Sequence, residues 1–406
     1  MIRNVVFVAP FFLDTTMRFL RAAVHHPNAQ VALISQDPLE RLPGDLRARI
    51  VGHRRLRDGL NTDRITDAVA DLSRTGPVHR LLGTLEQLQE PLGAVRDRLG
   101  LPGMRADAAR RFRDKALMKE TLRAAGIPCA RHRTIRQPQD AWDFIDAVGY
   151  PVVIKPPDGA GAKATFMVED AEALRQALRA NPPRPDRPLL GEEFIQGEEH
   201  SFDGVSLGGR LIWHSLTHYE PTPLEAVRNP WIQWCILLPR EVDHPQYNDI
   251  RSVASRALQA LGMGTGVSHL EWFRRRDGTI AISEVGARPG GVQISKLISY
   301  AHHMDFYRAW ARVMIDGQFD PPVRRYAAGA AFLRGQGKGR VRAIHGLEAA
   351  QKTVGPLVIE SNLPRIGVAP TGSYEGEGYA ILRHPETDVV RRALKTLISV
   401  VRVELG

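Results

Sequence analysis

Two glutamates in the middle of the chain have the type and spacing that a divalent metal site requires. Glu271 and Glu284 lie in apolar runs separated by Asp277-Gly278, a dipeptide typical of tight hairpins. A two-residue loop would pair Arg276 with Thr279 and place the two glutamates opposite each other, where like charges repel. A cation between them would relieve the repulsion, and carboxylates suit Mg²⁺. The alternatives are two solvated glutamates, or a bulge that shifts the register.

A lysine followed by a glycine-rich loop has the composition of an anion site. Lys155 ends an apolar run and precedes two prolines and the loop Gly159–Lys163. Gly159 and Gly161 let backbone N–H groups approach an anion closely. The chain has no Walker A pattern, so an ordinary turn stays open as an alternative for this element alone.

Two further stretches place charges where a nucleotide could use them. The stretch Glu192–Glu199 carries four acids around a strand end. Its backbone could meet an adenine edge and a carboxylate could accept from ribose hydroxyls, although solvated acids are the alternative. Arg288 follows Glu284 by four residues and could hold a phosphoryl group through paired hydrogen bonds.

The elements that must position these groups begin with a β-α-β pattern. Strands are predicted over Asn4–Ala9 and Gln30–Ser35, with a helix over Thr15–Val24 between them. This order predicts a parallel sheet in an α/β domain. Pro10-Phe11-Phe12 occupies the first turn in place of G-x-G-x-x-G, so we expect no dinucleotide site there.

The rest of the chain predicts long helices and hairpins. One helix is predicted over Ala106–Ala125, carrying Lys115 and Lys119, and another over Ile294–Met314. Gly208-Gly209 predicts a second tight hairpin. We therefore predict three parts: an N-terminal α/β domain over 1–105, a central region over 106–323 and a C-terminal α+β module over 324–406. The central region would comprise a small lobe at about 130–190 and a larger one at about 191–323.

Composition narrows the classes of function. The 406 residues have a net charge of +10, with 43% hydrophobic and 25% charged residues, typical of a globular protein with two or three domains. The arginines are scattered, so we expect no nucleic-acid partner. No apolar run has membrane-spanning length, so we expect no membrane partner either. Cys129 and Cys235 are isolated, which favours a reducing cytoplasm.

Taken in this order, these pieces make the chain resemble the ATP-grasp superfamily. The similarity runs from about residue 100 to 317 and is greatest to carboxylate–amine ligases of the L-amino-acid ligase type. Biotin carboxylase is a more distant relative. The matching segments are Arg113-Asp114-Lys115, Pro151–Pro156, Gly159–Lys163, Glu192–Glu199, Glu271 and Glu284–Gly291. The resemblance implies an ATP-grasp fold with an N-terminal parallel-sheet α/β domain and a β-rich C-terminal module.

The resemblance also implies roles for individual residues. Arg288 and Lys155 are the implied catalytic residues, and Arg288 would stabilise the acyl phosphate. Glu271 and Glu284 would bind Mg²⁺, with Mn²⁺ as an alternative. Glu192 would meet the adenine and Glu199 the ribose. The implied ATP-binding set is Lys115, Lys155, Gly159, Gly161, Lys163, Glu192, Glu193, Phe194, Ile195 and Glu199.

One departure from the family pattern concerns the metal. The family often has Asn two residues after the second metal glutamate, where this chain has Gly286. Water or a substrate oxygen must replace that ligand, or a second Mg²⁺ binds more weakly. The candidate substrate residues are His218, Glu220, Arg288, Gly290 and Gly291, with structural roles as the alternative. Trp231 and Trp234 could line a pocket or belong to the core.

The expected function is an ATP- and Mg²⁺-dependent ligase that joins a small-molecule carboxylate to an amine, both amino-acid-like. An acyl phosphate would form first, and ADP and phosphate would leave. The alternatives are bicarbonate activation as in carboxylases, phosphoryl transfer by a kinase, and a regulatory protein that binds nucleotide without turnover. Because related ligases are commonly dimers, a homodimer is one expected assembly.

Overall fold

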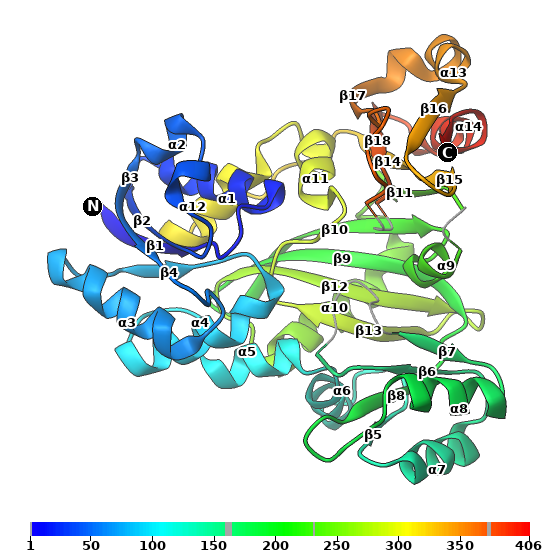
Figure 1. Cartoon of the computed structure of the whole chain (residues 1–406), viewed down its shortest axis with the longest axis horizontal. Helices are drawn as coiled ribbons and strands as arrows, with labels where there is room; N and C mark the ends of the chain where they lie inside the picture. The colour runs from blue at the N-terminus through cyan, green and yellow to red at the C-terminus, as the bar shows by residue number, and fades with distance from the viewer. Residues whose placement is uncertain (1, 159–164, 230–231, 372–374) are drawn as a thin grey trace.

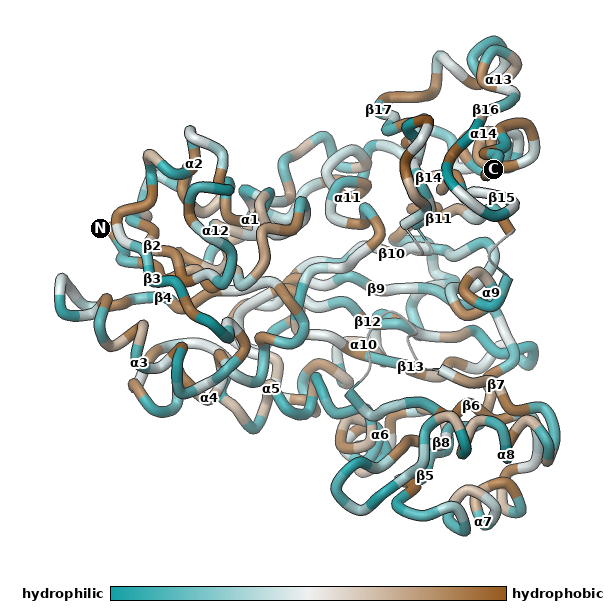
Figure 2. The backbone as a smooth tube through the Cα atoms, viewed as in Figure 1, coloured by the Kyte–Doolittle hydropathy of each residue, from teal (hydrophilic) through white to brown (hydrophobic). Residues whose placement is uncertain are grey.

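The computed structural model describes residues 2–158, 165–229, 232–371 and 375–406, which form four β-sheets with helices packed on them (Figure 1). The N-terminal sheet is parallel, in the order β3-β2-β1-β4, as the β-α-β pattern predicts. Its strands are β1 (Arg3–Val8), β2 (Ala29–Ser35), β3 (Ile50–Arg55) and β4 (Arg80–Leu82). The buried residues of β1 and β2 belong to the core of this part, and Figure 2 shows hydrophobic residues at β2.

Helices cover both faces of the parallel sheet, and one comes from far along the chain. Phe7 of β1 packs against Phe19 and Trp310 on one face, while Val6 packs against Ile65 on the other. The helices are α1 (Asp14–Val24), α2 (Gly44–Arg47), α3 (Thr62–Leu72), α4 (Gln89–Leu99) and α12 (Phe306–Asp316). The central region therefore returns to the N-terminal sheet through α12.

The small lobe is an antiparallel sheet in the order β5-β8-β6-β7 with two helices on it. The elements are β5 (His132–Ile135), α7 (Pro138–Val148), β6 (Val152–Lys155), β7 (Phe166–Val168), α8 (Ala171–Ala180) and β8 (Leu189–Glu193). Lys155 is the last residue of β6. Figure 1 shows β6 and β7 on the side of the small lobe that is nearest the large sheet. The loop Gly159–Lys163, with Gly159, Gly161 and Lys163, lies outside the described residues.

The large sheet has eight strands in the order β13-β12-β9-β10-β11-β14-β18-β17. They are β9 (Gly197–Leu207), β10 (Arg210–Glu220), β11 (Trp234–Leu238), β12 (Gly266–Arg275), β13 (Ile280–Gly286), β14 (Ala327–Leu333), β17 (Val358–Asn362) and β18 (Gly378–His384). Helix α10 (Asn248–Leu261) packs on one face, where Ile250 contacts the cluster around Leu270 and Trp272. Because β14 pairs with β11, the sheet continues across the boundary predicted at residue 324.

The remaining elements complete the C-terminal part and the connections. A three-stranded sheet contains β15 (Gly335–Gly337), β19 (Arg402–Leu405) and β16 (Val341–His345), near α13 (Leu347–Val354) and α14 (Thr387–Val400). Helix α9 (Pro223–Arg228) lies between β10 and β11. Short 3₁₀ turns cover Leu39–Arg41, Ser73–Thr75, Glu86–Leu88, Pro245–Tyr247 and Gly355–Leu357. No helix in the described part of the chain is both long and apolar enough to cross a membrane.

Two helices predicted as continuous are broken, and the prediction was wrong for the same reason in both. The first divides into α5 (Ala106–Arg113) and α6 (Lys115–Ala124), because Asp114 accepts hydrogen bonds from the backbone of α6 and caps it. The second divides into α11 (Ile294–His302) and α12, where Asp305 caps α12 in the same way. Asp competes with helix continuation by binding the free N–H groups of a first turn.

Candidate active site

The hairpin of β12 and β13 places Glu271 opposite Glu284, as predicted, but the pairing of the residues near the turn differs from the prediction. The turn is one residue longer than expected, because the N–H of Arg275 donates to the carbonyl of Thr279. A bulge at Ser283, further along β13, offsets the register by one residue in the opposite sense. The two offsets cancel, so the predicted Arg276–Thr279 pairing is wrong and the predicted opposition of the carboxylates is confirmed.

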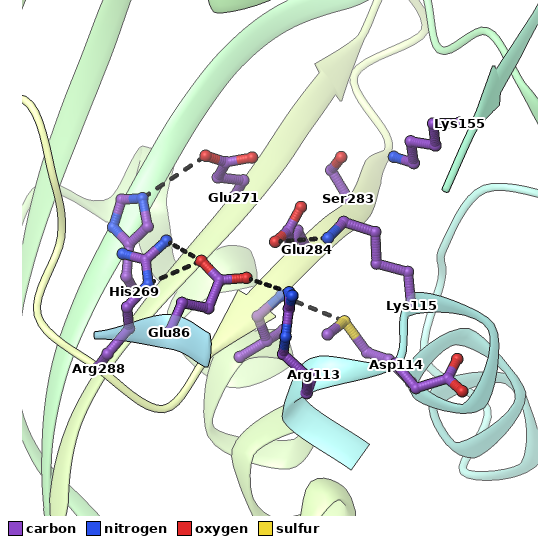
Figure 3. Close-up of polar contacts among 12 residues, drawn as sticks. Glu86, Arg113, Asp114, Lys115, Lys155, His269, Glu271, Ser283, Glu284 and Arg288 are labelled. Atoms are coloured by element: carbon purple, nitrogen blue, oxygen red, sulfur yellow. Dashed lines mark hydrogen bonds and ion pairs between the residues drawn. The ribbon is translucent and has the colours of Figure 1, made fainter. Parts of the chain in front are cut away.

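Each carboxylate of this pair has a cationic neighbour of its own (Figure 3). Lys115 Nζ lies 3.1 Å from Glu284 Oε1, and His269 Nε2 lies 3.6 Å from Glu271 Oε1. Burial acts to raise the pKa of Glu284, but Lys115 and Lys155 hold it below its ordinary value. The side chains stay 29% and 23% exposed, so the pair can still accept a ligand.

A third carboxylate, that of Glu192, is held between two lysines. Lys119 Nζ lies 2.9 Å from Glu192 Oε1 and Lys155 Nζ lies 2.8 Å from Oε2. Burial would raise the pKa of Glu192, but the two ammonium groups lower it to about 2. Glu192, which we expected to contact the adenine, therefore forms ion pairs with two lysines in the structure. Lys119 Nζ also donates to the Ser283 carbonyl, at 2.5 Å. The sequence could have indicated Lys119 as a site residue, because it lies four residues after Lys115 and therefore on the same helix face.

A cavity of about 200 Å³ lies between the small lobe and the large sheet. Most of the residues singled out from the sequence line it together. They are Lys115, Lys155, Glu192, Glu193, Phe194, Ile195, Glu199, Glu271, Glu284, Arg288 and Gly291. Glu199 is buried, and burial together with the charge of Glu271 raises its pKa well above the ordinary value. Contributions from both lobes make this cavity the candidate active site.

Arg288 enters the cavity in an orientation set by a residue that the sequence did not indicate. Its Nε and Nη2 both donate to Glu86 Oε2, at 2.9 and 2.7 Å, and Arg113 Nη1 donates to Glu86 Oε1 at 2.8 Å (Figure 3). Burial lowers the pKa of Arg288, but Glu86 raises it above its usual value. Glu86 belongs to the N-terminal part, and nothing in its neighbourhood in the sequence marks it as a site residue.

A buried polar chain supports Glu271 from behind. The Nδ1–H of His269 donates to Asp203 Oδ1 at 2.8 Å, and the hydroxyl of Ser201 donates to Asp203 Oδ2 at 3.2 Å. Burial disfavours a charged ring, but Asp203 and Glu271 raise the pKa of His269 to about 9. The alternation of side chains along a strand could have identified His269 as a site residue, because it lies two residues before Glu271 and therefore on the same face.

Two glycines fit closely around this chain. Gly286, the position of the missing Asn, lies directly opposite His269 in the ladder. A Cβ at Gly290 would come within 2.8 Å of Asp203 Oδ1 and 2.9 Å of His269 Nδ1. The candidate substrate residue Gly290 is therefore required for the loop after β13 to pack over the histidine, whereas Gly291 lines the cavity itself.

Comparison with known proteins identifies the central region. Residues 120–292 match the family model described as the ATP-grasp domain. The chain contains an ATP-grasp domain. This confirms the resemblance drawn from the motif order, and the mixed α/β architecture with one parallel, two antiparallel and one mixed sheet agrees with it.

Individual relatives extend that finding. The chain is 24% identical over 266 residues to the L-arginine-specific L-amino acid ligase of Bacillus subtilis, which covers 62% of this chain and 63% of that protein. The L-amino acid ligase of Bacillus licheniformis has the same fold, with a TM-score of 0.77, 19% identity and coverage of 100% and 99%. A biotin carboxylase domain of Hydrogenobacter thermophilus, solved with magnesium ADP, has a TM-score of 0.67, 16% identity and coverage of 99% and 91%.

Two candidate substrate residues of the ATP-grasp domain point away from the cavity. Tyr219 lines it, so the alternation of β10 directs His218 and Glu220 to the opposite side. His218 Nε2 lies 3.1 Å from the Tyr247 hydroxyl, and burial lowers its pKa to about 4. Glu220 lies 3.8 Å from Arg391 of α14. The sequence predicts the strand but does not indicate which of its faces lines the cavity.

The carboxylate pair of the ATP-grasp domain fits a magnesium ion that is shared with phosphates. Among residues 2–158, 165–229, 232–371 and 375–406, no three His, Cys, Asp or Glu side chains form a metal-binding group. Mg²⁺ in nucleotide sites is typically held by one or two carboxylates and by phosphate oxygens. Glu271 and Glu284 are such a pair, so a bound triphosphate would complete the ligand set.

Proposed function

We propose that this chain is an ATP- and Mg²⁺-dependent ligase that joins a carboxylate to an amine through an acyl phosphate, releasing ADP and phosphate. The observation that carries the proposal is the convergence of Glu271, Glu284 and Arg288 with two lysines in one cavity. The ligase names of its relatives support the reaction class. Amino-acid-like substrates, a homodimer and a cytoplasmic location belong to the same proposal.

The charges in the cavity suit the first step. A carboxylate that attacks the γ-phosphoryl group brings two anions together, so positioning and charge neutralisation provide most of the catalysis. Lys115 and Lys155 would hold the phosphates and reduce the repulsion. Mg²⁺ held by Glu271, Glu284 and phosphate oxygens would add further neutralisation of the developing charge.

Arg288 suits the step that follows. Glu86 holds its guanidinium from one side, so the group is oriented before substrate arrives. A fixed guanidinium stabilises the negative oxygens of an acyl phosphate and of the tetrahedral intermediate formed by amine attack. Acyl phosphates react with water, so the buried position of the cavity favours transfer to the amine. The role of Gly159–Lys163 as a lid stays a prediction.

The test is phosphate release from ATP across a matrix of amino acids, small carboxylates and amines, with analysis of the products. A ligase releases phosphate fastest when acid and amine are both present, and it forms an amide. Phosphate retained on an acid would indicate a kinase, and dependence on bicarbonate alone would indicate carboxylase-type activation. Nucleotide binding without phosphate release across the matrix would contradict the proposal and favour a regulatory protein.

A further inference from the structure

Two sets of apolar residues line the cavity, and we call them the small-lobe end and the α9 end. The small-lobe end consists of Val153, Phe194, Ile195 and Phe273. The α9 end consists of Tyr219, Pro223, Leu224, Val227, Trp234 and Val292. The two ends belong to different hydrophobic clusters: Ile195 and Phe273 pack in one, whereas Tyr219, Trp234 and Val292 pack in another. The two ends therefore belong to different parts of the protein core.

The small-lobe end already has an occupant under the proposed function. It includes the backbone of Phe194 and Ile195, which is expected to meet the adenine ring. The α9 end has no such ligand, although it includes Val292 of the loop that follows β13 and carries Arg288. Gly291 and Val292, three and four residues after Arg288, line the cavity on that side. A group bound at the α9 end would therefore lie close to the guanidinium that faces the reacting carboxyl group.

Helix α9 presents its apolar residues to the cavity and its charged residues elsewhere. Leu224 and Val227 are three residues apart, half-buried, and line the cavity. Glu225 is exposed, and Arg228 lies 3.7 Å from Glu169 outside the cavity. Within the described ranges, the segment from Tyr219 to Trp234 contributes no charged side chain to the lining.

Trp234 makes the far wall of this end rigid. It is fully buried and stacks on Phe332, with ring centroids 4.8 Å apart and an interplanar angle of 20°. A charged side chain placed against this wall would lose water without gaining an ionic partner there. An apolar side chain would gain from burial in proportion to its area.

We propose that the α9 end binds the side chain of the carboxylate substrate and selects aliphatic or aromatic side chains over charged ones. The inference rests on the proposed function, because it takes that substrate to be amino-acid-like. Leu224 and Val227 are then specificity-determining residues that contact the side chain and take no part in phosphoryl transfer, while the buried Trp234 supports them from behind.

The test measures binding, so that it does not depend on turnover. L-alanine, L-norvaline, L-norleucine, L-lysine and L-glutamate are titrated calorimetrically into the full chain with ADP and Mg²⁺. Each added methylene should tighten Kd about fourfold. L-lysine and L-glutamate should bind at least about tenfold more weakly than L-norleucine, because their charges would be desolvated. Equal affinities, tighter binding of a charged amino acid, or no binding of L-norleucine would overturn the inference.

Phosphate release on the same panel separates the two proposals. The expected order of affinities without any phosphate release from ATP would overturn the ligase and leave the α9 end as an apolar side-chain site. Phosphate release stimulated best by a charged amino acid would leave the ligase standing and overturn the specificity.

Variants on the two faces of α9 localise the effect. Val227→Asp should weaken L-norleucine more than about tenfold and raise the affinity for L-lysine relative to it. Glu225→Gln, on the exposed face of the same helix, should change neither. Val227→Thr has nearly the same shape and tests the site if the aspartate variant does not fold; it should weaken L-norleucine a few-fold. Unchanged binding in a folded Val227 variant would place the side chain elsewhere.

Discussion

The cavity contains the single carboxylate of Glu192 and the carboxylate pair of Glu271 and Glu284, which differ in the number of cationic side chains around them. Glu192 is only 7% exposed at its side chain, and both of its oxygens have a lysine within 2.9 Å. Glu284 has one lysine at 3.1 Å, and Glu271 has a histidine at 3.6 Å. Glu192 is thus saturated with cations, whereas the hairpin pair is not.

The difference separates a structural ion pair from a binding site. A buried carboxylate held by two ammonium groups has no reason to exchange them, since either exchange would separate opposite charges that are buried together. The hairpin carboxylates face each other and stay more exposed, so a stronger cation such as Mg²⁺ can replace weak contacts at low cost. The same residue type is therefore fixed in β8 and available in β12 and β13.

The largest expected effect comes from the exchangeable pair. Glu284→Gln removes a charge that Mg²⁺ requires, so kcat for phosphate release should fall at least about 10²- to 10³-fold while the fold is kept. Steady-state kinetics and the melting temperature measure the two effects. Glu198→Gln, an exposed glutamate of β9, is the control and should retain activity. Near-normal turnover in Glu284→Gln would remove the metal assignment.

Substitutions in the ion-pair network of Glu192 should lower the stability of the fold. Glu192→Gln leaves Lys119 fully buried beside a neutral group, so the free energy of unfolding should fall by about 3–5 kcal/mol. Lys119→Met should cost less, because Glu192 keeps Lys155 as a partner. Urea unfolding of both variants measures the order. A larger loss in Lys119→Met would mean that the hydrogen bond to Ser283 dominates.

The histidine behind Glu271 should affect metal affinity. His269→Asn removes the ring that joins Glu271 to Asp203, and groups that orient a metal ligand typically contribute about 10- to 100-fold in affinity. Calorimetric titration of Mg²⁺ into the ADP complex should show a loss in that range. His303→Asn, at an exposed position, is the matched control. An unchanged Kd would assign His269 to packing alone.

The stabilisation that the Glu192 carboxylate provides should also depend on pH. The pKa of Glu192 is lowered from an ordinary 4.5 to about 2, so its stabilisation is complete above about pH 4.5 and is lost as the pH falls towards 2. The difference in unfolding free energy between the native chain and Glu192→Gln should therefore shrink over that interval. Urea unfolding at pH 5, 4 and 3 measures it. A constant difference would contradict the depressed pKa.

The smallest effect is expected at the position of the missing ligand. In Gly286→Asn, the new Cβ would lie 3.4 Å from the nearest atom, in the Arg288 side chain, so the residue can be accommodated. An added amide oxygen near Glu284 should tighten Mg²⁺ a few-fold. Calorimetry on the ADP complex tests this against Gly286→Ala. Equal affinities in the two variants would show that another oxygen already fills the position.

Much of the fold and part of the site could be read from local patterns. The Gly208-Gly209 hairpin is confirmed, with Leu207 paired to Arg210 and both glycines at positive φ. The parallel N-terminal sheet and the ATP-grasp domain also follow from short runs and their order. These features involve residues close in sequence, whose spacing and chemistry report directly on their geometry.

The tertiary structure alone decided which charges meet. Glu86 and Arg288 are 202 residues apart, Lys119 and Ser283 are 164 apart, and no periodicity connects such positions. The register of the carboxylate pair likewise depended on two offsets that only the paired strands show. The sequence determined the set of chemical groups and their local supports. Packing between distant segments determined which groups are held in ion pairs and which are left for a ligand, because burial and charge pairing depend on all neighbours at once.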